Sequence, residues 1–117
     1  MVAHARSLDA AFHALGHPTR RAMLKLLAAG ERTVGELAAP FDVSLAASSK
    51  HLKVLENAKL VERSVDGRVH TCRLNARALK LVVDWTEAFR PHWEATFARL
   101  DGVLDELKGT GKGKGKG

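Results

Sequence analysis

Apolar residues recur at the spacing of an amphipathic helix over the first 30 positions. The first stripe predicts a helix over residues 8–15, capped by Ser7 and ended by Gly16. Its apolar face is formed by Leu8, Ala11, Phe12 and Leu15. A second helix is predicted from Pro18 to Ala29, because proline suits the first helical position and Gly30 follows as a stop. The inward positions of this helix are Met23, Leu24 and Leu27.

Two capping signals predict the next two helices. Thr33 and Glu36 have the spacing of a capping box, which opens a short helix that Pro40 prevents from continuing. Ser44 is a good N-cap for a fourth helix over Leu45–Asn57. The inward face of this helix is Leu45, Ser48, Leu52 and Leu55, and the outward face is Ala46, Ser49, Lys50, Lys53 and Asn57. Two helices joined by a short connection predict a helix-turn-helix unit.

After the fourth helix the apolar period changes from helical spacing to alternation. Val61–Val65 and Arg68–Leu74 read as strands on either side of Asp66-Gly67, and this dipeptide is a strong signal for a two-residue hairpin turn. The candidate hairpin is basic and carries Arg63, Arg68, His70 and Arg73. A basic hairpin after a helix-turn-helix predicts a wing.

The last part of the body returns to helical spacing. Asn75 caps a helical stretch from Ala76 to about Lys108, and Pro91 should kink it or start a fresh helix. The predicted fold class is therefore mainly α with a small β-hairpin, a winged helix-turn-helix, with a homodimer formed through the terminal helices.

Composition limits what this fold can be. A chain of 117 residues predicts one domain, residues 1–108, followed by a Gly/Lys tail at 109–117. Three of the six excess positive charges lie in that tail, so the body is only mildly basic. We expect the tail to be a flexible, solvated end or, alternatively, a basic strap that attracts phosphates. The single cysteine, Cys72, the absence of an apolar leader and the absence of an 18-residue apolar run favour a cytoplasmic protein that neither spans nor binds a membrane.

The pattern favours double-stranded DNA as the partner. A helix fits the major groove, and small or cationic side chains let it approach base edges and phosphates. The residues that we expect there are Ser44, Ala46, Ala47, Ser49, Lys50 and Lys53. On the wing, we expect contacts to the minor groove or phosphates from Arg63, Arg68 and His70. The alternative for both sets is an ordinary solvated surface.

Three sequence blocks resemble the ArsR/SmtB family of bacterial winged-helix repressors. They are Ala14–Arg21, Thr33–Ala38 and Ser49–Val61, and the resemblance extends over roughly Leu8 to Leu107. It implies a homodimer that binds a palindromic operator and represses transcription, with Ser49 and Lys50 at the positions where base contacts are usual. The chain departs from the family at Ser48, where an aliphatic residue is usual, and at Cys72, where an aromatic is usual.

Four of the six aromatic residues lie between positions 85 and 97, more than one terminal helix of a small domain ordinarily needs. Burial against a twin helix is the expected use, and packing on the monomer core is the alternative. The predicted dimer interface is Phe12, Leu15, Trp85, Phe89, Trp93, Phe97 and Leu100.

No cofactor, metal site or enzyme activity is predicted. The short third helix lacks the cysteine pair of the family's metal sensors, and Asp84, Glu87 and His92 read as polar surface. Phosphate-loop, nucleophile-elbow and HExxH motifs are absent. Two other functions stay open: a winged-helix module that binds a protein with little DNA readout, and non-specific DNA coating driven by the tail. Whether a metal or small-molecule effector exists cannot be read from the residues.

Overall fold

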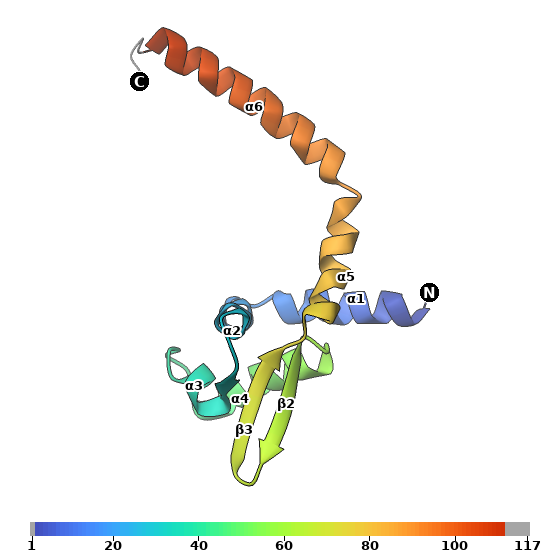
Figure 1. Cartoon of the computed structure of the whole chain (residues 1–117), viewed down its shortest axis with the longest axis vertical. Coiled ribbons are helices and arrows are strands. Elements are labelled where there is room, and N and C mark those ends of the chain that lie inside the picture. Colours follow the sequence, from blue (N-terminus) through green and yellow to red (C-terminus); the bar gives the residue numbers. More distant parts are fainter. Residues whose placement is uncertain (1, 112–117) are drawn as a thin grey trace. The chain divides into compact units, whose positions relative to one another are not determined.

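The computed structural model describes the backbone of residues 2–111 and the side chains of residues 7–109. The chain divides into two compact units at Val83–Asp84. The first unit contains α1 (Val2–Leu15), α2 (Pro18–Ala28), β1 (Arg32–Thr33), α3 (Val34–Ala38), α4 (Leu45–Asn57), β2 (Val61–Asp66), β3 (Val69–Leu74) and most of α5 (Ala76–Glu87) (Figure 1). The second unit contains the end of α5 and α6 (Arg90–Gly111).

The predicted capping signals are confirmed, and one predicted helix start is wrong. Thr33 Oγ1 accepts from the Glu36 amide at 3.2 Å, and the Glu36 carboxylate accepts from the Thr33 amide at 2.8 Å, so the capping box is complete. The bounds of α4 are those predicted. However, α1 begins at Val2, so Ser7 lies inside the helix instead of capping it. The five residues before Ser7 include two alanines and an arginine and no helix breaker, so they extend the helix.

The core of the first unit is built mainly from leucines of α2, α3 and α4. Its fully buried large side chains are Met23, Leu37, Leu52, Leu55, Leu60, Cys72 and Ser48. One inward assignment is wrong, because Leu45 is 64% exposed at the start of α4. In α1 the buried positions are the small residues Ala11 and Ala14, while Phe12 is 39% exposed, so α1 presents alanines to the core and leaves its largest side chain at the surface.

A three-stranded antiparallel sheet in the order β1-β3-β2 carries the predicted hairpin. Strand β1 was not predicted, because two residues are too few to show alternation; it pairs Arg32 with Cys72. The hairpin loop is Gly67–Arg68 instead of Asp66-Gly67, since Asp66 pairs with Val69. Gly67 takes φ +64 at the first loop position, a conformation that glycine adopts at no steric cost.

The terminal helical stretch is broken, as the proline predicted. Helix α5 ends at Glu87, and Pro91 is the second residue of the fresh helix α6. Arg90 spans the break through ion pairs with Glu87 at 2.6 Å and Glu94 at 3.1 Å. Helix α6 continues to Gly111, and the rest of the predicted Gly/Lys tail lies outside the described residues. Among the helices described here, none is long and apolar enough to span a bilayer.

Candidate nucleic-acid interface

The outward face of α4 is exposed, and its polar side chains have no partners among the described residues. Ala46, Ser49, Lys50 and Lys53 are all exposed. Within residues 7–109, no hydrogen bond or ion pair engages the side chains of Ser49, Lys50 or Lys53. A helix whose cations have no internal partner can give all of their donors to a ligand.

The start of α4 is fixed by its own cap. Ser44 is exposed, and its Oγ accepts from the Ala47 amide at 3.1 Å. Ala47 is half-buried, so of the six predicted groove residues it is the one least open to a ligand. The capped N-terminus carries the positive end of the helix dipole, which favours an anion.

Arg20 fixes the middle of α4 from the inner side. Its guanidinium donates to the carbonyls of Ala14 at 2.6 Å and His13 at 3.1 Å, which lie at the end of α1, and to His51 Nδ1 at 3.3 Å. Since guanidinium is only a donor, Nδ1 of His51 must be unprotonated in this contact. Burial, followed by the nearby His17 and Arg20, lowers the pKa of His51. Arg20 therefore links the end of α1 to His51 in the middle of α4, beside the exposed lysines.

Arg63 of the hairpin is held inside the protein. Its Nε and Nη2 donate to the two Glu56 carboxylate oxygens at 2.8 and 2.9 Å, and its Nη1 donates to His70 Nδ1 at 3.2 Å. The hydrogen bonds that Arg63 donates to Glu56 raise the pKa of its guanidinium, which stays charged. Sequence reasoning missed this contact, since Glu56 ends the preceding helix and nothing in the strand pattern shows that Arg63 turns back toward it.

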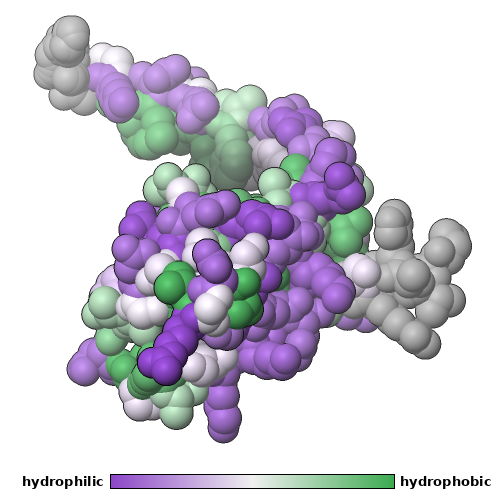
Figure 2. All heavy atoms as spheres, turned by 60° about the horizontal axis from the view of Figure 1, so that its bottom comes forward, coloured by the Kyte–Doolittle hydropathy of each residue, from purple (hydrophilic) through white to green (hydrophobic). Residues whose placement is uncertain are grey.

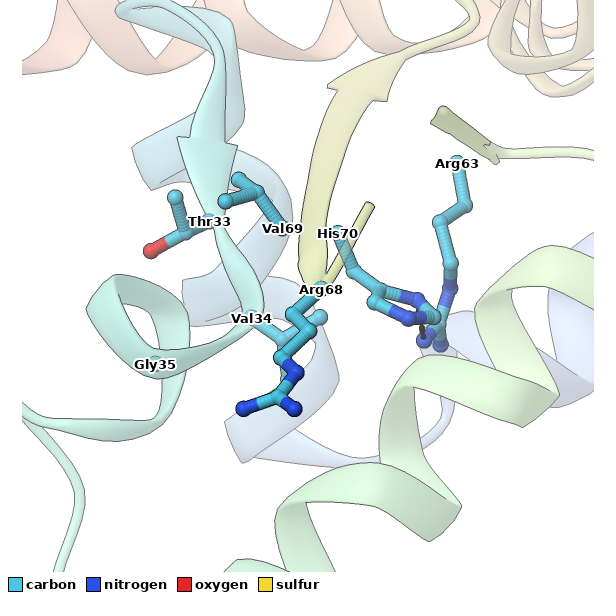
Figure 3. Close-up of a pocket in the computed structure, with 7 residues that line it drawn as sticks. All are labelled: Thr33, Val34, Gly35, Arg63, Arg68, Val69 and His70. Atoms are coloured by element: carbon cyan, nitrogen blue, oxygen red, sulfur yellow. Dashed lines mark hydrogen bonds between the residues drawn. The ribbon is translucent and has the colours of Figure 1, made fainter. Parts of the chain in front are cut away.

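Arg68 is the hairpin arginine whose side chain has no partner among the described residues. Arg73 pairs with Glu62 at 3.2 Å and donates to Ser64 at 3.2 Å. By contrast, Arg68 lies exposed in the hairpin loop with no ion pair or hydrogen bond among the described side chains. It lines an open groove of about 400 Å³ between the hairpin and the start of α3. Figure 3 shows Arg63 and His70 turned toward each other and the Arg68 guanidinium apart from both.

The surface at the α4 and hairpin end of the first unit is mostly polar. Figure 2 brings this end forward and shows hydrophilic residues over most of it, with smaller hydrophobic patches between them. The exposed large hydrophobic residues of these two elements are Leu45, Val65 and Val69. A polar surface with free cations suits a hydrated polyanion better than an apolar protein partner.

Comparison with known proteins identifies the family. A helix-turn-helix domain model matches residues 15–64. The transcriptional repressor SdpR of Bacillus subtilis is 34% identical over 74 residues, which cover 63% of this chain and 82% of SdpR. The crystal structure of an ArsR family transcriptional regulator matches at TM-score 0.71 and 38% identity, over 77% of this chain and 93% of that one. The chain belongs to the ArsR family of transcriptional regulators.

A further relative of known structure supports the fold. The homodimeric winged helix-turn-helix DNA-binding domain of a possible ArsR-family regulator from Mycobacterium bovis matches at TM-score 0.62 and 26% identity, covering 80% of this chain and 88% of that one. The winged helix-turn-helix fold predicted from the sequence is thus confirmed for this ArsR-family chain.

The second unit of this ArsR-family protein exposes an apolar stripe. Trp85, Phe89, Phe97 and Leu100 are between 43% and 56% exposed, and Trp93 is half-buried. The rings of Trp85 and Phe89 lie 4.9 Å apart. On α6 the stripe follows a 4-3-4-3 spacing through Trp93, Phe97, Leu100, Leu104 and Leu107. This is the heptad spacing of a helix that packs along a partner helix.

Cys72 and the acidic residues were the candidates for a metal or redox site. Cys72 is fully buried, and burial raises the pKa of its thiol, so the reactive thiolate is disfavoured. Among the described residues, no group of three or more His, Cys, Asp or Glu side chains is placed to hold a metal ion.

Proposed function

We propose that this ArsR-family regulator is a dimeric repressor that binds palindromic operator DNA through α4 and the hairpin. The observation that carries the proposal is the outward face of α4, where Ser49, Lys50 and Lys53 are exposed and free of internal partners. In the major groove, Ser49 and Lys50 would contact base edges and Lys53 a phosphate. The protein would act as a regulator without catalysis, in the cytoplasm where a bacterial chromosome lies.

The cap and the hairpin have supporting parts in this proposal. Ser44, Ala46 and Ala47 would let the start of α4 approach the DNA backbone closely. Arg68 would reach the flanking minor groove or phosphates, because it is the hairpin arginine with free donors. Arg63 and His70, predicted as direct contacts, are engaged with Glu56 and with each other, which favours an indirect role.

The dimer is proposed on the exposed apolar residues. Burying the heptad stripe of α6 against its twin would remove its large side chains from water, at roughly 25 cal/mol per Å² of apolar area. Phe12 and the half-buried Leu15 of α1 are proposed to join the interface. Two-fold symmetry would present two α4 helices about 34 Å apart, one turn of DNA, which is why the operator is proposed to be palindromic.

Selection from randomised DNA, followed by a salt titration, tests this function. We expect an inverted repeat, a preference over random duplex of at least about 10³-fold, and a steep loss of affinity with salt. Sedimentation should give a dimer at micromolar concentration, and Phe97→Asp should give a folded monomer with weaker operator binding. A wild-type monomer that retains full operator affinity would contradict the dimer.

A second candidate function has one observation in its favour. The apolar stripe of α6 also suits a protein partner, as expected of a winged-helix interaction module. That module would show no preference among DNA sequences.

Removing residues 112–117, which hold three lysines, tests the third function, non-specific DNA coating driven by the tail. Tail-driven coating predicts complete loss of DNA binding, whereas operator recognition predicts an even, modest loss across sequences.

A further inference from the structure

Glu56 is a carboxylate on a surface that is proposed to meet phosphates. It lies seven residues after Ser49 on α4, two helical turns further along the same face. An unpaired carboxylate there would repel DNA. Its position on that face therefore requires a physical reason.

The reason lies in its contact with Arg63. The guanidinium and the carboxylate form two parallel hydrogen bonds at 2.8 and 2.9 Å, the strongest geometry available to this pair. Their side chains are 25% and 21% exposed, while those of the Arg73–Glu62 pair on the same hairpin are 49% and 51% exposed. Lower exposure means less screening by solvent, so the Glu56 pair holds its geometry better.

The contact ties three elements together at one point. Arg63 belongs to β2, Glu56 to α4, and His70, which accepts the third hydrogen bond, to β3. Arg63 pairs with Cys72 across the hairpin, so His70 is its diagonal neighbour on the same face. Besides this contact, α4 and β2 are joined by the short connection Ala58–Leu60, in which Lys59 takes φ +65, and by the burial of Val61 in the core that contains Leu52 and Leu55.

The tie acts near the middle of the hairpin, while the free arginine lies at its tip. Between the Arg63–Cys72 pair and the Asp66–Val69 pair the strands advance three residues, about 10 Å. A change of hairpin direction at the Arg63–Cys72 pair therefore displaces Arg68 relative to α4.

We propose that Glu56 is a positioning residue for DNA recognition, which, through Arg63 and His70, sets the direction of the hairpin relative to the outward face of α4. The inference rests on the proposed DNA binding. It assigns Glu56 no contact with DNA; the residue makes operator specificity depend on α4 and Arg68 engaging together.

Glu56→Gln tests the proposal, with Glu62→Gln as the matched control. Each variant removes one negative charge and one arginine partner, but Glu62 pairs with Arg73 in the solvent-exposed contact. Affinity is measured for the selected operator and for a random duplex of equal length, together with hydroxyl-radical footprints. Both variants should bind random duplex more tightly. Glu56→Gln should also lower the operator-to-random ratio about tenfold and lose the footprint flanking the α4 contacts, while Glu62→Gln should keep the ratio within about twofold.

Arg63→Lys provides the second test if Glu56→Gln does not fold. It keeps the charge but cannot form the paired hydrogen bonds, so random-duplex affinity should stay constant while the operator ratio falls. Folding is checked by circular dichroism and thermal unfolding. A folded Glu56→Gln or Arg63→Lys with the wild-type ratio and footprint overturns the inference and leaves the proposed function intact. A wild-type protein with no operator preference overturns both.

Discussion

Helix α4 and the hairpin that follows it both present basic side chains, but they differ in how those charges are used. Lys50 and Lys53 of α4 have no internal partners, whereas two of the three hairpin arginines are paired with carboxylates. A count of cations along the sequence would not distinguish the paired side chains from the unpaired ones. In the structure, the lysines of α4 have free donors, whereas in the hairpin only Arg68 does, because Arg63 and Arg73 are held in ion pairs.

The largest expected effect is on α4. Lys50→Ala should weaken operator binding by about 1–3 kcal/mol and relax the preference at one base pair, because it removes a free base-edge donor. Binding to operators substituted one position at a time measures this. Lys25→Ala, which removes an exposed lysine from α2, is the control for net charge and should change little. An equal loss on all sequences would assign Lys50 to a phosphate.

The next effect distinguishes the hairpin arginines from one another. Arg68→Ala should lower operator affinity about fivefold at moderate salt. It should also reduce the slope of log affinity against log salt concentration (the salt slope) by about one, as expected for the loss of one contact with a phosphate. Arg73→Ala should leave the slope nearly unchanged, because Glu62 already partners Arg73. Titrations from low to high salt compare the two. If the two variants have the same slope, the division drawn between free and paired arginines is wrong.

The inner side of α4 offers a smaller effect on stability. Ser48 is fully buried, and its Oγ has no hydrogen-bond partner among the described residues. Ser48→Ala removes a desolvated hydroxyl with little change in volume, so it should raise the free energy of unfolding by about 1 kcal/mol. Chemical denaturation measures it. Ser49→Ala, the same substitution on the exposed face of α4, is the control and should show only the smaller gain, about 0.5 kcal/mol, that comes from the higher helix propensity of alanine.

Local signals in the sequence were enough for most of the helices and their caps, but not for the start of α1, where Ser7 lies inside the helix. Thr33 with Glu36, Ser44 and Pro91 each act within a few residues, so spacing alone predicts their effect. The outward placement of Lys50 and Lys53 follows from the same helical period.

What escaped prediction depends on contacts between elements. The capping of α1 by Arg20 and the pairing of Arg63 with Glu56 require the three-dimensional arrangement of helices and strands. Strand β1 exists because β3 offers it an edge, not because of its own two residues. Leu45 was misassigned because periodicity gives the face of a helix but not how far the core extends along it.

The smallest effect concerns the connection between the two elements compared above. After α4, the amide of Leu60 donates to the Leu55 carbonyl at 3.0 Å and that of Lys59 to the Glu56 carbonyl at 2.9 Å, which is a Schellman ending. The residue in the left-handed position is Lys59, with φ +65, where glycine is usual because a Cβ is strained there. Lys59→Gly should therefore raise the free energy of unfolding by about 0.5–1 kcal/mol in chemical denaturation. Lys59→Ala keeps the Cβ and the strain while removing the charge, so it should show no gain.

The same two variants also test what sets the hairpin direction. If Glu56 and Arg63 set it, Lys59→Gly should have the same operator-to-random ratio as Lys59→Ala. A lower ratio in the glycine variant would show that the strained connection sets the hairpin direction.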